Sequence, residues 1–146
     1  MDPEAAHAFA LQAHSGQLDR RGLPLVDHIE RVAAGAPPEA RAVAYLHELL
    51  ERADGSLQPL MGAGLDPDEA DAIVLLTREQ GESYEAHAMR IAHGRGRAGT
   101  LARAVKLADL DDQLRHRRAP GEPPYGWARQ HVLVCTDRYD HTPQAA

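Results

Sequence analysis

The sequence predicts an all-α, single-domain protein of about seven helices. Apolar residues recur at spacings of three and four, as at Val43, Leu46, Leu49 and Leu50, which is typical of helices with one buried face. No stretch alternates apolar and polar residues as a strand would, and no internal repeat is present. A chain of 146 residues can bury about two thirds of its unfolded surface as one domain.

The first two helices are predicted from their N-terminal residues and apolar stripes. Asp2 suits an N-cap and Pro3 suits the first helical position, so we expect a helix over residues 3–13. A polar, turn-forming segment follows it. A second helix is then expected over residues 25–34, with His28 in its first turn on the apolar face.

The next helix mixes apolar and ionisable residues. We expect it over residues 39–53, after the Gly- and Pro-rich linker 35–38 and before Asp54-Gly55. Ser56 is then expected to cap a short helical piece that reaches Met61.

Two further helices are predicted before a glycine-rich segment. Asp66 and Pro67 mark the start of a helix over residues 66–77, with acidic residues in its first turn. The apolar positions of residues 82–93 predict another helix. The glycine-rich segment 94–99 is expected to form a loop.

The last part of the chain completes the core. Thr100 is expected to cap a helix over residues 101–116 that has a broad buried face. Residues 117–126 are rich in Pro and Gly and predict a loop, and a final helix is expected over residues 127–139. We therefore assign residues 1–140 to one domain and residues 141–146 to a frayed tail.

Composition excludes several classes of protein. The net charge of -6 argues against a general nucleic-acid binder, and the single Cys135 excludes an internal disulfide. No apolar run reaches the ~20 residues of a membrane span, and the first residues lack the basic start of a signal peptide. We therefore expect a cytoplasmic protein without nucleic-acid or membrane partners.

Ionisable side chains interrupt the apolar pattern of the central helix. His47 and Glu51 lie one turn apart, and Glu48 lies beside His47, so an imidazole and two carboxylates project into one small volume. A His-Glu pair on a helix is usually a surface pair, and a lone buried histidine such as His28 is usually a satisfied core residue. Asp109, directly after apolar residues in its helix, also needs a partner.

Together these residues form a possible ligand set for a divalent cation. His28, His47, Glu48 and Asp109 suit Mn²⁺, Fe²⁺, Zn²⁺ or Mg²⁺ and would leave positions open for water. Such an ion lowers the pKa of bound water and polarises a phosphoryl oxygen, so the set points to phosphoester hydrolysis. Glu51 is then the candidate general acid or base.

Four separated blocks resemble the HD superfamily of metal-dependent phosphohydrolases. More specifically, they look like those of the Rel/Spo hydrolase domain and the small alarmone hydrolases, which use Mn²⁺ to remove the 3′-diphosphate of (p)ppGpp. The blocks follow the family's order at close to its spacing, over residues 5–115. They are Ala10-Leu-Gln-Ala-His-Ser-Gly-Gln17, Gly22-Leu-Pro-Leu-Val-Asp-His28, Ala44-Tyr-Leu-His-Glu-Leu-Leu-Glu51 and Val105-Lys-Leu-Ala-Asp109.

The resemblance implies an HD-type helical bundle and assigns roles to residues. His28, His47 and Asp109 take ligand positions, Glu48 takes that of the family's aspartate, and Glu51 aligns with the first acid of the catalytic Glu-Asp pair. The expected catalytic residues are therefore Glu51 and Glu48. The implied substrate-binding residues are Arg20, Lys106, Tyr84, Arg90 and Gln113.

This chain also departs from the family pattern. Glu48 is longer than the family's aspartate, and Arg52 replaces the second catalytic acid. Leu25 stands in place of a tyrosine and Gln113 in place of an asparagine, which bears on the guanosine specificity. Three readings therefore stay open: a (p)ppGpp or other nucleotide hydrolase, an impaired nucleotide-binding or regulatory relative, and a purely structural helical module. The expected partner is a small nucleotide, and the expected state is a monomer or homodimer.

Overall fold

The computed structural model describes residues 1–53, 55–116 and 118–141, and within these ranges the regular elements are helices alone. This confirms the predicted all-α class, and the helices form one domain. The elements are α1 (Pro3–Ala13), α2 (Leu25–Gly35), the 3₁₀ turn η1 (Pro38–Ala40), α3 (Arg41–Leu46), α4 (Leu49–Arg52), α5 (Gln58–Gly62), α6 (Pro67–Leu76), α7 (Tyr84–Ala92), α8 (Gly96–Leu114) and α9 (Tyr125–Asp140).

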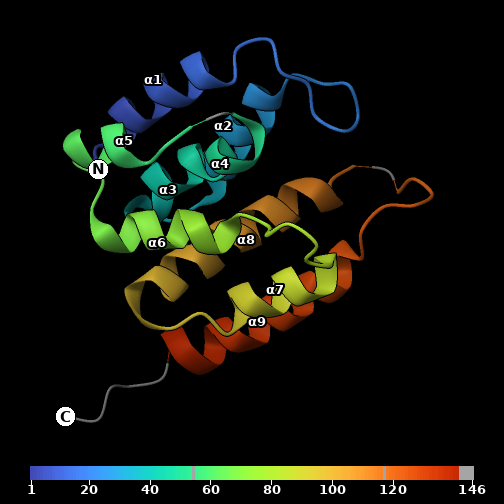
Figure 1. Cartoon of the computed structure of the whole chain (residues 1–146). Helices are drawn as coiled ribbons and strands as arrows, with labels where there is room; N and C mark the ends of the chain where they lie inside the picture. The colour runs from blue at the N-terminus through green and yellow to red at the C-terminus, as the bar shows by residue number, and fades with distance from the viewer. Residues whose placement is uncertain (54, 117, 142–146) are drawn as a thin grey trace, which may run out of the picture.

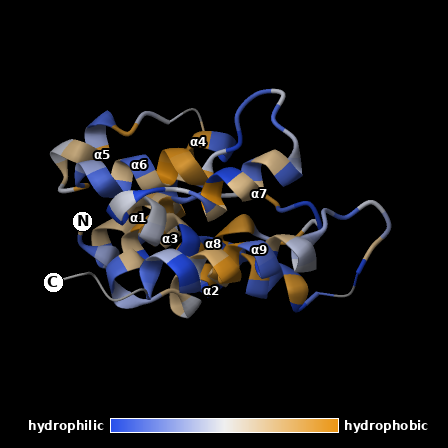
Figure 2. Cartoon of the chain, turned by 90° about the horizontal axis from the view of Figure 1, so that it is seen from below, coloured by the Kyte–Doolittle hydropathy of each residue, from blue (hydrophilic) through white to orange (hydrophobic). Residues whose placement is uncertain are grey.

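The long helix α8 lies at the centre of the bundle. It packs against α9, α6, α2, α7 and α3. In Figure 1 the helices α1 to α5 form one group, α7 and α9 form another, and α6 and α8 lie between them. Apolar segments gather toward the middle of the molecule in Figure 2, where the helices face one another. The core therefore surrounds α8, and side chains from α2, α3 and α8 can meet inside it.

Two of the predicted helix starts are confirmed by their caps. The carboxylate of Asp2 accepts the backbone N–H of Ala5 at the start of α1. Asp66 and Glu69 form a capping box at the start of α6, since each side chain accepts a hydrogen bond from the other's backbone N–H.

The central helix is not continuous, contrary to the expectation of one helix over residues 39–53. It divides into α3 and α4 at His47 and Glu48. The ring of His47 donates from Nδ1 to the carbonyl oxygen of Ala44 at 2.6 Å. That carbonyl is the one an uninterrupted helix would offer to the N–H of Glu48. The interruption therefore lies at the pair that was expected to bind metal.

The start of α8 was also predicted wrongly. The helix begins at Gly96 instead of residue 101, so part of the expected glycine-rich loop is helical. A Cβ atom at Gly99 would lie 2.0 Å from the carbonyl oxygen of Gly94. Glycine at this position thus allows the preceding turn to pack directly on α8. Glycine content alone predicts a loop, so the start of the helix was predicted too late. Thr100 lies inside the helix, where it donates to the carbonyl of Gly96.

Smaller differences occur at other helix starts. The helix α7 begins at Tyr84, directly after the N-cap Ser83, and α9 begins at Tyr125, two residues before the predicted start.

Some predictions lie outside the described residues, namely the helix end at Asp54, the loop residue Arg117 and the tail residues 142–146. None of the described helices is both long and apolar enough to cross a membrane.

Candidate metal centre

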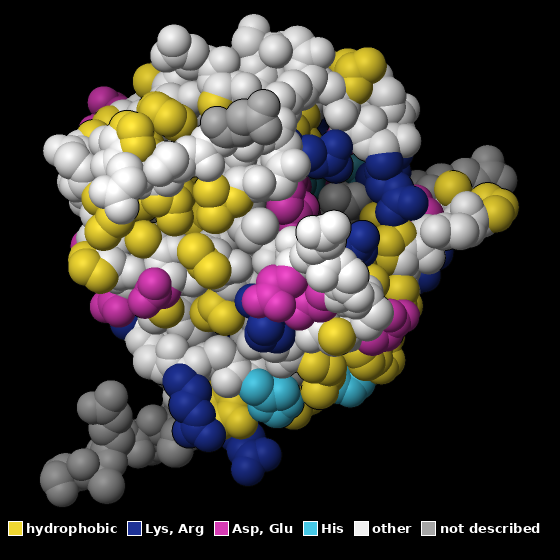
Figure 3. Space-filling view, viewed as in Figure 1, with side chains coloured by type: hydrophobic (Ala, Val, Ile, Leu, Met, Phe, Trp, Pro, Cys, Tyr) yellow, Lys and Arg dark blue, Asp and Glu magenta, His cyan; other side chains and the backbone are white. Residues whose placement is uncertain are grey.

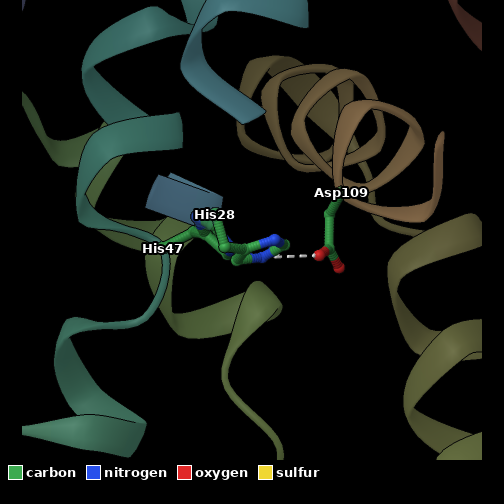
Figure 4. A group of neighbouring side chains, drawn as sticks. All are labelled: His28, His47 and Asp109. Carbon is green, nitrogen blue, oxygen red and sulfur yellow. Dashed lines mark ion pairs between the residues drawn. The ribbon is translucent and has the colours of Figure 1, made fainter. Parts of the chain in front are cut away.

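Three segments that are distant in sequence bring their side chains to one point. His28 comes from α2, His47 from the junction of α3 and α4, and Asp109 from α8 (Figure 4). One ligand atom from each lies within 4.8 Å of the others. All three residues are buried, with exposed fractions of 3%, 6% and 8%. This group could hold a metal ion.

The buried atoms of this group lack hydrogen-bond partners among the described residues. They are Nε2 of His28, Nε2 of His47 and Oδ1 of Asp109. The shortest ion pair between them, 3.1 Å from His28 Nε2 to Asp109 Oδ1, does not have hydrogen-bond geometry. Because a buried polar atom without a partner is costly, a cation that accepts all three lone pairs fits this donor set.

The other nitrogen of each imidazole is already engaged. His28 Nδ1 lies 2.7 Å from Oδ2 of Asp112, and His47 Nδ1 lies 2.6 Å from the carbonyl oxygen of Ala44. Both partners are acceptors, so each Nδ1 carries a proton and each Nε2 can offer a lone pair in the neutral ring. Asp112 was not identified from the sequence as a residue of this site. The available signal was a second aspartate one turn beyond Asp109 on the same helix.

Glu48 lies beside the three-residue group without belonging to it. Its Oε1 atom is 3.4 Å from Nε2 of His47 and 3.9 Å from Nε2 of His28. Its other oxygen faces Nε of Arg52 at 3.6 Å. The carboxylate is therefore shared between the two imidazoles and Arg52.

Opposite charges balance the centre. Burial lowers the pKa of His28, but contacts with Asp109 and Asp112 outweigh this and raise it to about 10. The pKa of His47 is also raised, since its contact with Glu48 outweighs burial. Burial raises the pKa of Glu48, yet the His47 imidazole lowers it to about 2. The pKa of Asp109 is held well below its usual range, because Lys106 and His28 outweigh burial.

The centre opens onto a pocket of about 210 Å³ that contains most of the predicted site residues. His47, Glu48 and Asp109 form one part of its wall, and Figure 3 shows a hollow flanked by Lys or Arg and Asp or Glu side chains. The predicted residues Arg20, Glu51, Tyr84, Lys106 and Gln113 also line the pocket.

Arg90 does not line this pocket. Its guanidinium donates to both oxygens of Glu82 at 2.9 Å and to the carbonyl oxygen of Thr77. The structure therefore places Arg90 in a local contact between α7 and the loop before it. Two other arginines, Arg52 and Arg78, line the pocket, although neither was predicted to bind substrate.

Several pocket residues are held in place by neighbours. Glu51 Oε1 accepts the backbone N–H of Arg78 at 2.5 Å. Lys106 Nζ lies 3.2 Å from Asp109 Oδ2 and 5.6 Å from the centre of the Tyr84 ring. The hydroxyl of Tyr84 is buried and has no hydrogen-bond partner among the described residues. The pocket thus offers a polar hydroxyl and a half-buried cation beside Asp109.

The far wall of the pocket is aromatic and polar. Arg20 donates to the hydroxyl of Tyr125 at 3.0 Å, and Gln113 accepts from Arg21 at 2.8 Å. Tyr125 and Tyr84 make an edge-to-face contact with ring centres 6.0 Å apart. Arg20, Tyr84, Gln113 and Tyr125 line the same pocket as His47 and Asp109.

No family model matches this chain, and comparison with curated proteins gives no significant match. The functional argument therefore depends on the residues and geometry of the site itself.

A larger cavity, of about 470 Å³, lies at the start of α8 and does not overlap the metal centre. Two of the arginines that line it are paired with carboxylates: Arg97 with Asp66 at 2.9 Å and Arg103 with Asp140 at 2.7 Å. The smaller pocket is therefore the better candidate site, because it combines ligand atoms without partners with ionisable groups.

Proposed function

We propose that this protein is an HD-type, metal-dependent phosphohydrolase that acts on a nucleotide, with guanosine 3′,5′-bis(diphosphate) as the best candidate substrate. The observation that carries the proposal is the buried group of His28, His47 and Asp109, whose ligand atoms lack hydrogen-bond partners and adjoin a pocket with several cations.

The proposed cofactor is a divalent cation, with Mn²⁺ the first candidate and Mg²⁺, Fe²⁺ or Zn²⁺ as alternatives. Two imidazole nitrogens and a carboxylate oxygen form a donor set that these ions accept. When bound, such a cation acts as a Lewis acid that polarises a phosphoryl oxygen and acidifies water. His28, His47 and Asp109 would hold the cation. Glu48 lies close enough to His47 to contact the coordination shell of the cation.

The remaining pocket residues supply charge and proton transfer. Arg20, Arg52, Arg78 and Lys106 offer positive charge to the phosphates, which carry most of the substrate's negative charge. Glu51 is the proposed general acid or base, and the N–H of Arg78 fixes one of its oxygens. The wall formed by Tyr84 and Tyr125 is suited to the nucleoside part.

A second candidate function is nucleotide binding without efficient turnover. The specific observation in its favour is the ion pair between Glu48 and Arg52, 3.6 Å long. In this alternative Arg52 neutralises a carboxylate that an active relative would use at the metal, and the pocket retains a ligand for regulation.

Metal analysis followed by a substrate panel tests both candidates. The protein is purified without chelator, its metal content is measured, and it is incubated with Mn²⁺ and ppGpp, GTP or deoxynucleotides. Metal together with release of pyrophosphate from ppGpp supports the hydrolase. Metal and nucleotide binding without product supports the second candidate. Absence of metal and of nucleotide binding contradicts both and leaves a structural module.

A further inference from the structure

Asp112 is a buried carboxylate next to the metal centre to which the proposed function gives no role. It lies on α8, one turn beyond Asp109, and its exposed fraction is only 3%. Its Oδ2 atom accepts from Nδ1 of His28 at 2.7 Å, and its Oδ1 atom accepts from Nε of Arg31 at 2.6 Å. Arg31 also reaches Oδ2 through Nη2 at 3.3 Å. Both oxygens are therefore used.

The arrangement fixes the orientation of His28. His28 and Arg31 are neighbours on one face of α2, so the helix presents both groups to the same carboxylate on α8. An ionised carboxylate can only accept hydrogen bonds, so the proton of the neutral ring is held on Nδ1. The lone pair is then on Nε2, which lies 3.1 Å from Asp109.

We infer that Asp112, held by Arg31, is a positioning residue that fixes the ring orientation and tautomer of His28, so that the lone pair of the neutral ring lies on Nε2 and faces the centre. This inference depends on the proposed metal centre. A carboxylate behind a ligand histidine typically changes metal affinity by about 10- to 100-fold when it is removed. A simple ion pair that joins α2 to α8 would contribute to stability without this effect on affinity.

Asp112→Asn separates the two roles. The charged Arg31 guanidinium has only donors, so it takes the single amide oxygen of the new side chain. The amide NH₂ group then faces His28 and needs an unprotonated Nδ1, which moves the proton to Nε2 and blocks the ligand atom. We expect Asp112→Asn to lower the affinity for Mn²⁺ by about 10- to 100-fold in calorimetric titrations.

A double variant provides the decisive comparison. In Arg31→Met/Asp112→Asn the amide oxygen is released to accept from His28 Nδ1, so we expect most of the Mn²⁺ affinity to return. The melting temperature without metal should not rise, because the double variant has lost the arginine contacts as well. Asp111→Asn is the matched control: Asp111 is an exposed aspartate on the same helix, paired with Arg129, and its loss should leave the affinity unchanged.

The outcomes distinguish this inference from the proposed function. Wild-type affinity in Asp112→Asn, or no recovery in a folded double variant, overturns the positioning role while leaving the metal centre intact. Absence of Mn²⁺ binding by the unaltered protein overturns both.

A measurement on the unaltered protein covers the case in which the variants do not fold. Nitrogen-15 spectra of the Zn²⁺-loaded protein should show a proton on Nδ1 of His28 and the metal on Nε2. The opposite assignment contradicts the inference.

Discussion

Nε2 of His28 lies 3.1 Å from Oδ1 of Asp109, although the two residues belong to helices at distant positions in the chain. Both atoms are buried, and neither has a hydrogen-bond partner in the described part of the protein. The acceptors behind each imidazole already direct the Nε2 atoms of His28 and His47 toward this point. The ligand group is therefore assembled by the packing of α2, α3 and α8 alone.

Metal binding should release protons. The pKa of His28 is raised to about 10, so its ring carries an extra proton at neutral pH without metal, and the pKa of His47 is also raised. A cation at Nε2 must displace that proton, so affinity should increase with pH up to the pKa of His28. We expect between about one and two protons released per ion at pH 7. Titration calorimetry in two buffers of different ionisation enthalpy measures this number. A heat that is the same in both buffers would contradict the expected exchange.

Glu51→Gln should impair turnover without loss of metal. The carboxylate lines the pocket but is not one of the three clustered ligands, so the variant should keep its Mn²⁺ affinity. We expect kcat for ppGpp hydrolysis to fall by about 100- to 10,000-fold, as for loss of a general acid or base. Rates under saturating Mn²⁺ provide the test, with the exposed Glu85→Gln as the matched control. An unchanged rate in Glu51→Gln would remove this residue from the mechanism.

His87 should make the protein sensitive to acid. Burial and the nearby Lys106 lower the pKa of His87 from its ordinary 6.5 to about 4, and its ring donates to the carbonyl oxygen of Leu75. The unfolded chain therefore binds a proton at a higher pH than the folded protein, so this stability is present above pH 6.5 and is lost as the pH falls toward 4.

Urea unfolding of His87→Gln at two pH values tests this prediction. Between pH 7.5 and pH 5 the wild type should lose about 2 kcal/mol more of its unfolding free energy than the variant. His131 on α9 provides the control. His131→Gln should lose as much unfolding free energy between pH 7.5 and pH 5 as the wild type does. Parallel loss in wild type and His87→Gln would show that His87 is not buried in its neutral form.

Gly99→Ala should destabilise the turn between α7 and α8. The added methyl group would lie 2.0 Å from the carbonyl oxygen of Gly94, and backbone atoms cannot move aside without shifting the helix. We expect a loss of about 3 kcal/mol or more, measured by urea unfolding. Gly62→Ala is the control: it changes another helical glycine with no atom within 4 Å of the new Cβ, and should be neutral or slightly stabilising. Equal effects of both substitutions would contradict the close packing.

Local signals were sufficient for much of the fold. The pairs Asp2-Pro3 and Asp66-Pro67 predicted two helix starts because capping depends on residues within a single turn. Apolar spacing predicted most of the other helical segments, and isolated polar residues within that spacing identified His28, His47 and Asp109. A polar residue on an apolar helix face needs a buried partner, so sequence alone can indicate such a cluster.

The differences from the prediction involve short-range contacts whose geometry apolar spacing does not give. The ring of His47 takes the carbonyl of Ala44 and interrupts the central helix, which depends on a side-chain direction that spacing does not give. Gly99 allows close packing instead of a loop, and this requires knowledge of where Gly94 lies. Arg90, which was expected to bind substrate, does not line the pocket, and its guanidinium is paired with Glu82.

Mn²⁺ titration of the wild type beside His47→Ala, with metal content and helical circular dichroism recorded for both, tests the metal centre most directly. The wild type should bind one Mn²⁺ per chain. His47→Ala should keep its helical signal and bind Mn²⁺ at least about 100-fold more weakly, since one of three clustered ligands is lost. His131→Ala, on the surface of α9, should behave as the wild type. Equal Mn²⁺ binding by His47→Ala, or collapse of its helical signal, would contradict the proposed centre.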